Sequence, residues 1–275
     1  MKRSRLFLIV LAFVLVAAGC SDDKKTAEPP QSSASSAAPQ VLDILVSNDD
    51  GVTAPGIDAL VQALLKRPAV KVTVVAPAQN QSGTGGKTSA GAVATPAKTA
   101  SGYDATAVNG FPADAVNYGL TKVFTPDNQP DLVMAGANLG QNLGPFIDVS
   151  GTVGAARAGA AAGVVSIAIS SGVGDPVDYA PAVAAAMKWL DDHEVDLRAG
   201  PLPPISVFNL NGPTCAPGTK VRGTVEVAPN PDAPPADALA PANCASTAPP
   251  APTDVVAFHD GYTTLSEVTI QPVQK

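Results

Sequence analysis

Three polar, glycine-containing segments of this sequence could carry chemistry, because each follows a short apolar run typical of a buried strand. They are residues 47–51, 76–83 and 136–144, which come after the runs 42–46, 70–75 and 131–135. The carboxyl ends of parallel strands lie along one edge of a sheet, where open α/β sheets bind their ligands. We therefore expect the three segments to converge on one site.

The most reactive pair in these segments is Asp49-Asp50, two adjacent carboxylates at a strand end. Alone, an Asp-Asp-Gly sequence is equally typical of a solvated turn. In a partly dry cleft, however, like charges favour a shared proton or a bound cation. Side-chain oxygens from Ser82 and Asn138 would complete an all-oxygen ligand set, which suits magnesium, manganese or calcium better than zinc.

A second candidate site is Ser150-Gly151-Thr152, which precedes an Ala- and Gly-rich helical pattern at 153–162. The hydroxyl groups can cap that helix, and its free N–H groups can bind an anion. Capping alone would also explain the pattern. A cation next to an anion-binding helix start favours hydrolysis of a phosphate ester.

Other kinds of chemistry are disfavoured by the composition. The 275 residues contain only two histidines and three cysteines, which excludes a His-rich or a four-cysteine zinc site. Gly86-Lys87-Thr88 lacks the earlier glycine of a P-loop, and Ser82 lacks the flanking glycines of a nucleophile elbow. The formal net charge of −7 disfavours binding to nucleic-acid phosphates.

The elements that must position these residues alternate between strand and helix, which predicts right-handed crossovers and a mostly parallel sheet. We expect a Rossmann-like three-layer α/β domain over residues 41–212. The predicted strands are 42–46, 70–75, 105–108, 131–135, 164–170 and 205–210, and the predicted helices are 57–65, 114–122, 153–162 and 179–192. Residues 213–275 form a C-terminal extension, with extended segments at 221–228 and 263–273 that predict a β-hairpin or an oligomerisation arm.

The N-terminus has the pattern of an export signal. Basic residues, a short apolar run and Ala17-Ala18-Gly19-Cys20 make residues 1–19 a predicted lipoprotein signal peptide, with Cys20 the lipidated residue. An ordinary signal peptide that contains a cysteine is the alternative. Residues 20–40 are rich in Ser, Ala and Pro and are typical of a flexible tether. The expected location is extracytoplasmic, with the chain lipid-anchored to a bacterial membrane.

Export bears on the two remaining cysteines. In an oxidising compartment, Cys215 and Cys244 form an even pair, and we expect a disulfide between them. Two free buried thiols are the alternative. The segment between them is too rich in proline to be helical.

Taken together, these motifs resemble the survival protein SurE family of metal-dependent nucleotidases. The likeness runs from about residue 42 to 273 and rests on ordered motifs. They are Ser47 to Gly51, Ala54-Pro55-Gly56, Ala76-Pro77, Asn80 to Gly83, Gly110, Pro112 to Asp114, Val116, Pro130 to Val133, Gly136, Asn138, Asn142 to Gly144, Ser150 to Ala156, Thr253-Asp254 and Gly261-Tyr262.

The resemblance implies hydrolysis of nucleoside monophosphates, with some members acting on short polyphosphate, in homodimers or homotetramers that exchange a C-terminal arm. It implies metal ligation by Asp49, Asp50, Ser82 and Asn138 to a divalent ion such as magnesium or manganese. The implied phosphate contacts are Asn48, Asn142, Ser150, Gly151 and Thr152. Water would attack the phosphate while Asp49 or Asp50 assists proton transfer.

Some positions depart from the family pattern, and these departures bear on substrate preference and rate. The family usually has Asp-Arg, Thr, Cys and Ser at the positions of Ala78-Gln79, Phe111, Ala115 and Ala135. A catalytically weak or inactive binding lipoprotein for phosphorylated solutes is therefore the alternative function.

Overall fold

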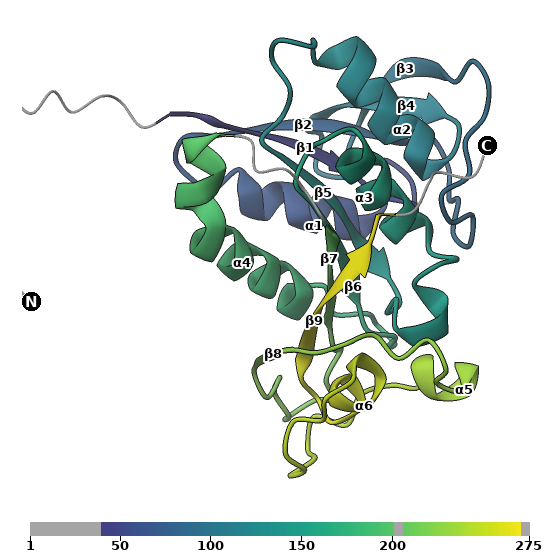
Figure 1. Ribbon diagram of the computed structural model, residues 1–275, viewed down its shortest axis with the longest axis vertical. Helices are drawn as coiled ribbons and strands as arrows, with labels where there is room; N and C mark the ends of the chain where they lie inside the picture. Colours follow the sequence, from purple (N-terminus) through teal and green to yellow (C-terminus); the bar gives the residue numbers. More distant parts are fainter. Residues whose placement is uncertain (1–39, 201–205, 271–275) are drawn as a thin grey trace, which may run out of the picture. The chain divides into compact units, whose positions relative to one another are not determined.

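The computed structural model describes residues 40–200 and 206–270, so the predicted signal peptide and nearly all of the predicted tether lie outside the described residues. Nine strands form one sheet in the order β3-β4-β2-β1-β5-β6-β7-β9-β8 (Figure 1). The strands are β1 Leu42–Ser47, β2 Val70–Pro77, β3 Val93–Lys98, β4 Asp104–Asn109, β5 Leu132–Leu139, β6 Ser166–Ser171, β7 Ser206–Gly212, β8 Thr224–Glu226 and β9 Thr263–Thr269. The α-helices are α1 Pro55–Leu64, α2 Pro112–Tyr118, α3 Gly151–Ala161, α4 Ala180–Ala199, α5 Pro235–Ala238 and α6 Asp254–His259.

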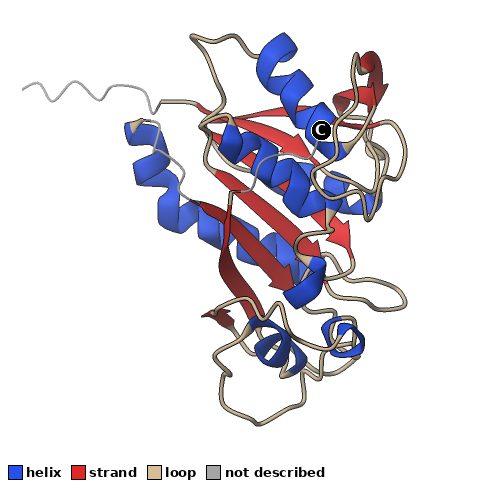
Figure 2. Ribbon diagram, turned by 45° about the vertical axis from the view of Figure 1, so that its right-hand side comes forward, coloured by secondary structure: helices blue, strands red, loops and turns tan. Residues whose placement is uncertain are grey.

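The predicted α/β fold is confirmed. The six consecutive strands β4, β2, β1, β5, β6 and β7 are parallel to one another. The flanking strands β3 and β9 pair antiparallel with β4 and β7. Helices cover both faces of the sheet, with α1 and α4 on one side and α2 and α3 on the other (Figure 2). The three layers agree with central strands β1, β5, β6 and β7 whose residues are almost all buried, as is typical of a sheet covered on both faces.

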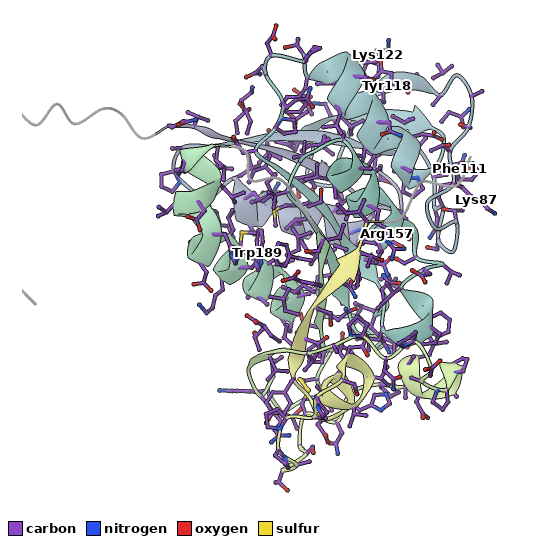
Figure 3. All side chains as sticks on the ribbon, viewed as in Figure 1. Lys87, Phe111, Tyr118, Lys122, Arg157 and Trp189 are labelled. Carbon is purple, nitrogen blue, oxygen red and sulfur yellow. A yellow bond between two sulfur atoms is a disulfide. The ribbon has the colours of Figure 1, made fainter. Side chains whose placement is uncertain are left out.

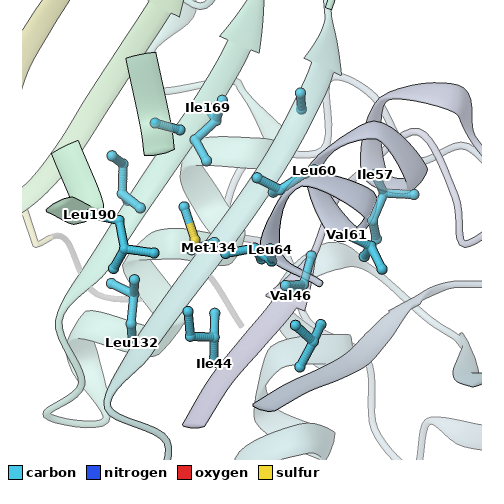
Figure 4. Packing of buried hydrophobic residues seen from close by; sticks show 14 of the residues in the cluster. Ile44, Val46, Ile57, Leu60, Val61, Leu64, Leu132, Met134, Ile169 and Leu190 are labelled. Carbon is cyan, nitrogen blue, oxygen red and sulfur yellow. The ribbon is translucent and has the colours of Figure 1, made fainter. Parts of the chain in front are cut away.

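The two faces are packed differently. On one face, Ile57 and Leu60 of α1 pack with Ile44 and Val46 of β1 and with Leu190 of α4 (Figure 4). On the other face, α3 contributes mainly alanine and glycine, so its backbone approaches the sheet closely. A Cβ added to Gly159 of α3 would lie 2.8 Å from Cγ2 of Val133 and 2.5 Å from Oγ of Ser166.

Arg157 is the one charged residue of α3, and it fixes the end of the last strand. Its Nε donates to the carbonyl oxygen of Thr269 at 3.1 Å, and its Nη2 donates to Oδ1 of Asp148 at 2.7 Å (Figure 3). The buried guanidinium therefore joins α3 to β9 and to the loop before α3.

The C-terminal extension supplies strands, but they do not form the predicted hairpin. β8 runs parallel to β9, and β9 returns antiparallel to β7. A hairpin requires adjacent antiparallel strands, whereas here a long connection containing α5 and α6 separates β8 from β9. That connection builds a small apolar cluster of Leu143, Ala233, Ala238, Val255 and Phe258.

A disulfide joins the segment before β8 to this connection. Cys215 and Cys244 are bonded, with their Cα atoms 5.6 Å apart and a sequence separation of 29. Reducing the bond should lower the free energy of unfolding by about 3 kcal/mol, because the unfolded chain regains the entropy of an open loop. Urea denaturation with and without reductant measures this difference. A Cys215→Ser, Cys244→Ser variant should show the same loss and no further response to reductant.

Candidate active site

The order of the strands places a ligand site beside β1. The chain moves from β1 to β2 on one side and later returns to β5 on the other side, so the connections that leave β1 and β5 diverge. Ligands bind at such switch points, at the carboxyl ends of the strands. Asp49 and Asp50 follow β1, and Asn142 follows β5.

Four segments that are far apart in sequence are joined here by hydrogen bonds. The amide of Gln81 donates to the carbonyl oxygen of Asp49 at 2.7 Å, and the amide of Leu139 donates to Oδ2 of Asp50 at 2.9 Å. Oγ1 of Thr152 donates to Oδ1 of Asp49 at 2.6 Å. The loops after β1 and β2, the end of β5 and the start of α3 therefore meet at the aspartate pair.

A cavity of about 240 Å³ opens at this junction. Its lining contains five of the predicted site residues, Asp49, Ser82, Asn138, Asn142 and Ser150, together with Gly83, Leu139, Gly140, Gln141, Phe146, Val149, Val173 and Leu239. The other predicted residues, Asn48, Asp50, Gly151 and Thr152, do not line the cavity but adjoin those that do.

Asp49 is the most perturbed carboxylate of the site. Its side chain is 2% exposed. The pKa of Asp49 is raised from 3.8 to about 6, mainly because burial disfavours the ionised form and also because of the neighbouring charge of Asp50, while hydrogen bonds from Thr152 oppose the rise. Ionising Asp49 costs free energy in the metal-free protein, so a bound cation would stabilise the ionised carboxylate.

Asp50 is half-buried, and burial raises its pKa as well, opposed by the hydrogen bond from the amide of Leu139. The secondary structure predicted around Asn138 was wrong. The sequence predicted that the strand ends at residue 135, but β5 continues to Leu139 through a register shift between Ala135 and Asn138. The shift changes the alternation of side chains along the strand, which is why the simple strand pattern missed it.

The two asparagines implied as phosphate contacts differ in their hydrogen bonding. Nδ2 of Asn48 donates to the carbonyl oxygen of Gly51, while its buried Oδ1 has no partner. Nδ2 of Asn142 donates to Oγ of Ser170 at 2.9 Å, and the backbone N–H of Asn142 donates to Oδ1 of Asn211 at 2.7 Å. Asn142 lines the cavity, but its position is set by β6 and β7.

The start of α3 abuts Asp49. Ser150 is the N-cap of this helix, and its Oγ accepts a hydrogen bond from the amide of Val153 at 3.1 Å. A Cβ added to Gly151 would lie 2.8 Å from Cβ of Asp49, so a glycine is needed for the helix to approach the carboxylate this closely. The positive end of the helix dipole thus faces the cavity region where a phosphate would be neutralised.

The loop after β2, which carries Ser82, is held against α3 by another glycine. A Cβ added to Gly154 would lie 2.1 Å from the carbonyl oxygen of Gly85 and 2.9 Å from the amide nitrogen of Gly86. Backbone thus packs directly on backbone, and the position of Ser82 depends on this contact.

Gly154→Ala should therefore lower the free energy of unfolding by about 1–3 kcal/mol through overpacking. It should also lower activity by about a hundredfold through displacement of the Ser82 loop. Alanine is otherwise the better helix former by about 1 kcal/mol. A stabilised variant with unchanged activity would show that the loop does not rest on Gly154.

Two residues that the sequence analysis did not single out as site residues shape the cavity. Gln141 is 3% exposed, and its amide group bridges the end of β6 and the extension. Asp254 is fully buried, and its carboxylate accepts hydrogen bonds from the amides of Gly144, Asn230 and Val255 at 2.8–2.9 Å. No local sequence pattern marks either residue, because most of their hydrogen-bond partners lie in other elements far away in sequence.

A larger hollow of about 710 Å³ lies elsewhere, between α4 and the strands β7, β8 and β9. Its lining includes His193, Phe208, Glu226 and Glu267. It lies away from the carboxyl ends of β1 and β5 and contains none of the predicted site residues. The smaller cavity is therefore the better candidate on chemical grounds.

The fold and the site together define an α/β protein with an oxygen-donor site at the switch point of a mostly parallel sheet. A model of the family described as Survival protein SurE matches residues 44–229, which shows that the chain belongs to the SurE family.

Individual relatives agree with this assignment. The chain is 37% identical to a protein of Methylococcus capsulatus over 182 residues, which are 66% of this chain and 68% of the relative. It is 45% identical to a protein of Methanopyrus kandleri over 136 residues, or 48% of this chain and 49% of the relative. Both relatives are named 5'-nucleotidase SurE. Most of the similar curated relatives are matched over about two thirds of their length.

The fold also matches a solved structure, the SurE protein from Aquifex aeolicus, with a TM-score of 0.66 and 24% identity. The match covers 84% of this chain and 94% of the other. At this level of identity the likeness supports the fold.

Proposed function

We propose that this protein is a metal-dependent phosphomonoesterase that hydrolyses nucleoside monophosphates to nucleoside and phosphate. The observation that carries the proposal is the junction at Asp49, where a buried carboxylate, an adjacent carboxylate and a helix N-terminus border one cavity. Membership of a family whose curated relatives are named 5'-nucleotidase supports it.

The donor set fits a divalent cation. All of the proposed ligands, Asp49, Asp50, Ser82 and Asn138, offer oxygen, and the pKa values of both carboxyls are raised in the metal-free protein. Among the described residues, no three or more His, Cys, Asp or Glu side chains are placed together so that they could hold a metal ion, so the proposed site relies on hydroxyl and amide oxygens beside its two carboxylates. Oxygen ligands of this kind suit magnesium or manganese.

The residues of the chain have separate roles in this proposal. A cation held by the four ligands would act as a Lewis acid on the phosphoryl group. The start of α3 at Ser150, Gly151 and Thr152 binds the phosphate oxygens through its free N–H groups and the Ser150 hydroxyl, since the Thr152 hydroxyl already donates to Asp49. Asn48 and Asn142 contact the phosphate from the ends of β1 and β5. Asp49 or Asp50 would accept a proton from the attacking water as a general base.

The test is phosphate release from a panel of nucleoside monophosphates and an aryl phosphate, with magnesium, with manganese or with a chelator. We expect release that depends on the metal and differs between substrates. A folded protein that releases no phosphate with any metal, but binds nucleoside monophosphates, would instead be a binding member of the family.

We further propose that the protein acts outside the cytoplasm, anchored through lipid on Cys20. The Cys215–Cys244 disulfide supports an oxidising compartment. In the described part of the chain, no helix is both long and apolar enough to cross a membrane. A dimer or tetramer built through the C-terminal extension is the proposed assembly, and light scattering measures its size.

Cys20→Ala tests the anchor. The wild-type chain should partition with membranes and incorporate a radiolabelled fatty acid, and the variant should do neither. A wild-type chain without label, or a variant that keeps it, would contradict lipidation at Cys20. Cys215→Ser controls for the loss of a cysteine and should keep both the label and the membrane association.

A further inference from the structure

One wall of the site cavity comes from the C-terminal extension. Of the described residues that line the cavity, Leu239 is the only one that follows β7 in the chain. The carbonyl oxygens on either side of it, those of Ala238 and Ala240, accept hydrogen bonds from Nε2 of Gln141 at 3.2 and 3.0 Å. Gln141 lines the cavity too and is 3% exposed. The extension is therefore bound to the cavity through one buried side-chain amide.

The other end of this Gln141 bridge lies at the carboxyl ends of β6 and β7. Oε1 of Gln141 accepts a hydrogen bond from the amide of Val173 at 2.8 Å, and Val173 follows β6. Thr214 follows β7, and its Oγ1 donates to the carbonyl oxygen of Gly172 at 2.6 Å. The segment that carries Val173 and the segment that leads into Cys215 are therefore joined to each other.

The disulfide joins the same two parts of the molecule as Gln141 does. It bonds Cys215, at the end of the sheet, to Cys244, which follows Leu239 in the extension. Between β8 and Cys244 the chain forms the short helix α5 and buries only Ala233 and Ala238. Two alanine side chains bury little apolar surface. The covalent bond is therefore a main attachment of this segment to the sheet.

We propose that the Cys215–Cys244 disulfide is a redox switch for the cavity. With the bond intact, residues 227–243 are held at one end by β8 and at the other by Cys244, and Gln141 keeps Leu239 at the cavity. A dithiol reductant supplies two electrons and two protons, so that the S–S bond becomes two thiols and the reductant becomes a disulfide. The segment then opens more often, and the cavity loses this wall. The inference rests on the proposed function and adds a regulation of that same site.

The groups proposed to act on the phosphate and the metal are fixed by other contacts. Asn142 donates hydrogen bonds to Ser170 of β6 and to Asn211 of β7. Asp49 accepts its hydrogen bond from Thr152 of α3. These bonds do not involve the segment between β8 and Cys244. Reduction should therefore weaken the binding of a substrate that contacts the wall, while the catalytic groups stay in place.

The experiment compares the full chain before and after complete reduction by dithiothreitol, with alkylation and mass spectrometry to confirm free thiols at Cys215 and Cys244. Reduction should raise the KM for a nucleoside monophosphate by about tenfold, and reoxidation should restore it. The kcat value and the inhibition constant of inorganic phosphate should each change by less than about twofold.

Two variants control this result. The Cys215→Ser, Cys244→Ser variant should have the KM of the reduced wild type and should not respond to dithiothreitol, which excludes effects of the reductant on the metal. Gln141→Ala should raise the KM of the oxidised protein, and reduction should then add little, because both bridges hold the same wall. An unchanged KM after complete reduction, or equal losses of substrate and phosphate binding, would overturn the inference. If neither variant folds, the reduced and reoxidised wild type still decides it.

Hydrogen exchange separates this inference from the proposed function. If the oxidised protein releases phosphate from no ester, the proposed function is wrong. The amides of Val173, Leu239 and Ala240, which are hydrogen-bonded in the fold, then report on the wall without turnover. Exchange that becomes about tenfold faster at these amides on reduction, with β1 and β5 unchanged, would support the switch. Equal exchange in the two redox states would overturn it.

Discussion

Asp49→Asn should abolish turnover and at the same time stabilise the metal-free protein. Turnover should fall by about a thousandfold, because the site loses a metal ligand and a charge that acts in the transition state. The free energy of unfolding should rise by up to about 3 kcal/mol at pH 8, since the pKa of Asp49 is about 6 in the fold and 3.8 ordinarily. Urea denaturation after removal of metal measures this gain.

The pH dependence of the gain has a definite sign. The folded state holds the proton of Asp49 more tightly than the unfolded state does, so the contribution of this group is fully present below pH 3.8 and is lost as the pH rises through about 6. The difference between the variant and the wild type should therefore be largest above pH 6 and vanish near pH 3. A variant that is less stable than the wild type at pH 8 would contradict the claim that ionised Asp49 destabilises the metal-free fold.

Asp58→Asn is the matched control, because its expected sign is opposite. Burial alone would raise the pKa of Asp58, but hydrogen bonds from Ser101 and Thr99 outweigh it and hold this pKa below its ordinary value. Neutralising Asp58 should therefore lower the stability above pH 4. Activity should be unchanged, because Asp58 lies on α1 outside the cavity.

The second large effect is expected at Asp254. Its carboxylate is the shared acceptor for amides of the loop after β5, the extension and α6. Asp254→Ala removes the acceptor of three N–H groups, of which those of Gly144 and Val255 are buried, and should lower the free energy of unfolding by about 3 kcal/mol or more. KM should rise as well, since Gly144 is two residues from Asn142 and loses its anchor.

Asp254→Asn keeps one side-chain oxygen as an acceptor and should lose less stability than Asp254→Ala. Asp237→Asn changes an exposed carboxylate in the same extension and should alter neither stability nor KM. If Asp254→Ala and Asp237→Asn were indistinguishable by denaturation and by kinetics, the anchoring role of Asp254 would be wrong.

The sequence predicted the main sheet and the meeting of three loops because apolar strands and the polar residues after them are local signals. The runs at 42–46 and 70–75 became β1 and β2, and the helix predicted over 57–65 corresponds to α1, which begins two residues earlier at Pro55. The edge strand β3 was missed, because its sequence Val-Ala-Thr-Pro-Ala-Lys is mostly exposed and lacks an apolar pattern. An edge strand needs only one partner, so its sequence is weakly constrained.

The parts of the site that were missed depend on tertiary contacts. The roles of Gln141 and Asp254 depend on the extension packing against the end of β5, which brings together hydrogen-bond partners that are about 100 residues apart in sequence. The predicted hairpin was wrong for the same reason. β9 pairs with β7, and nothing in the sequence of β9 indicates which strand it pairs with. Residue types at strand ends identify a candidate site, but its walls come from the topology.

The most direct test of the account is a titration of Mn²⁺ into metal-stripped protein, with bound metal and phosphate release from a nucleoside monophosphate measured in the same samples. The account predicts one functional site per chain, activity that rises in proportion to bound metal, and loss of both in Asp49→Asn. Full activity without bound metal, or metal binding and turnover that Asp49→Asn leaves unchanged, would contradict the assignment of this junction as the active site.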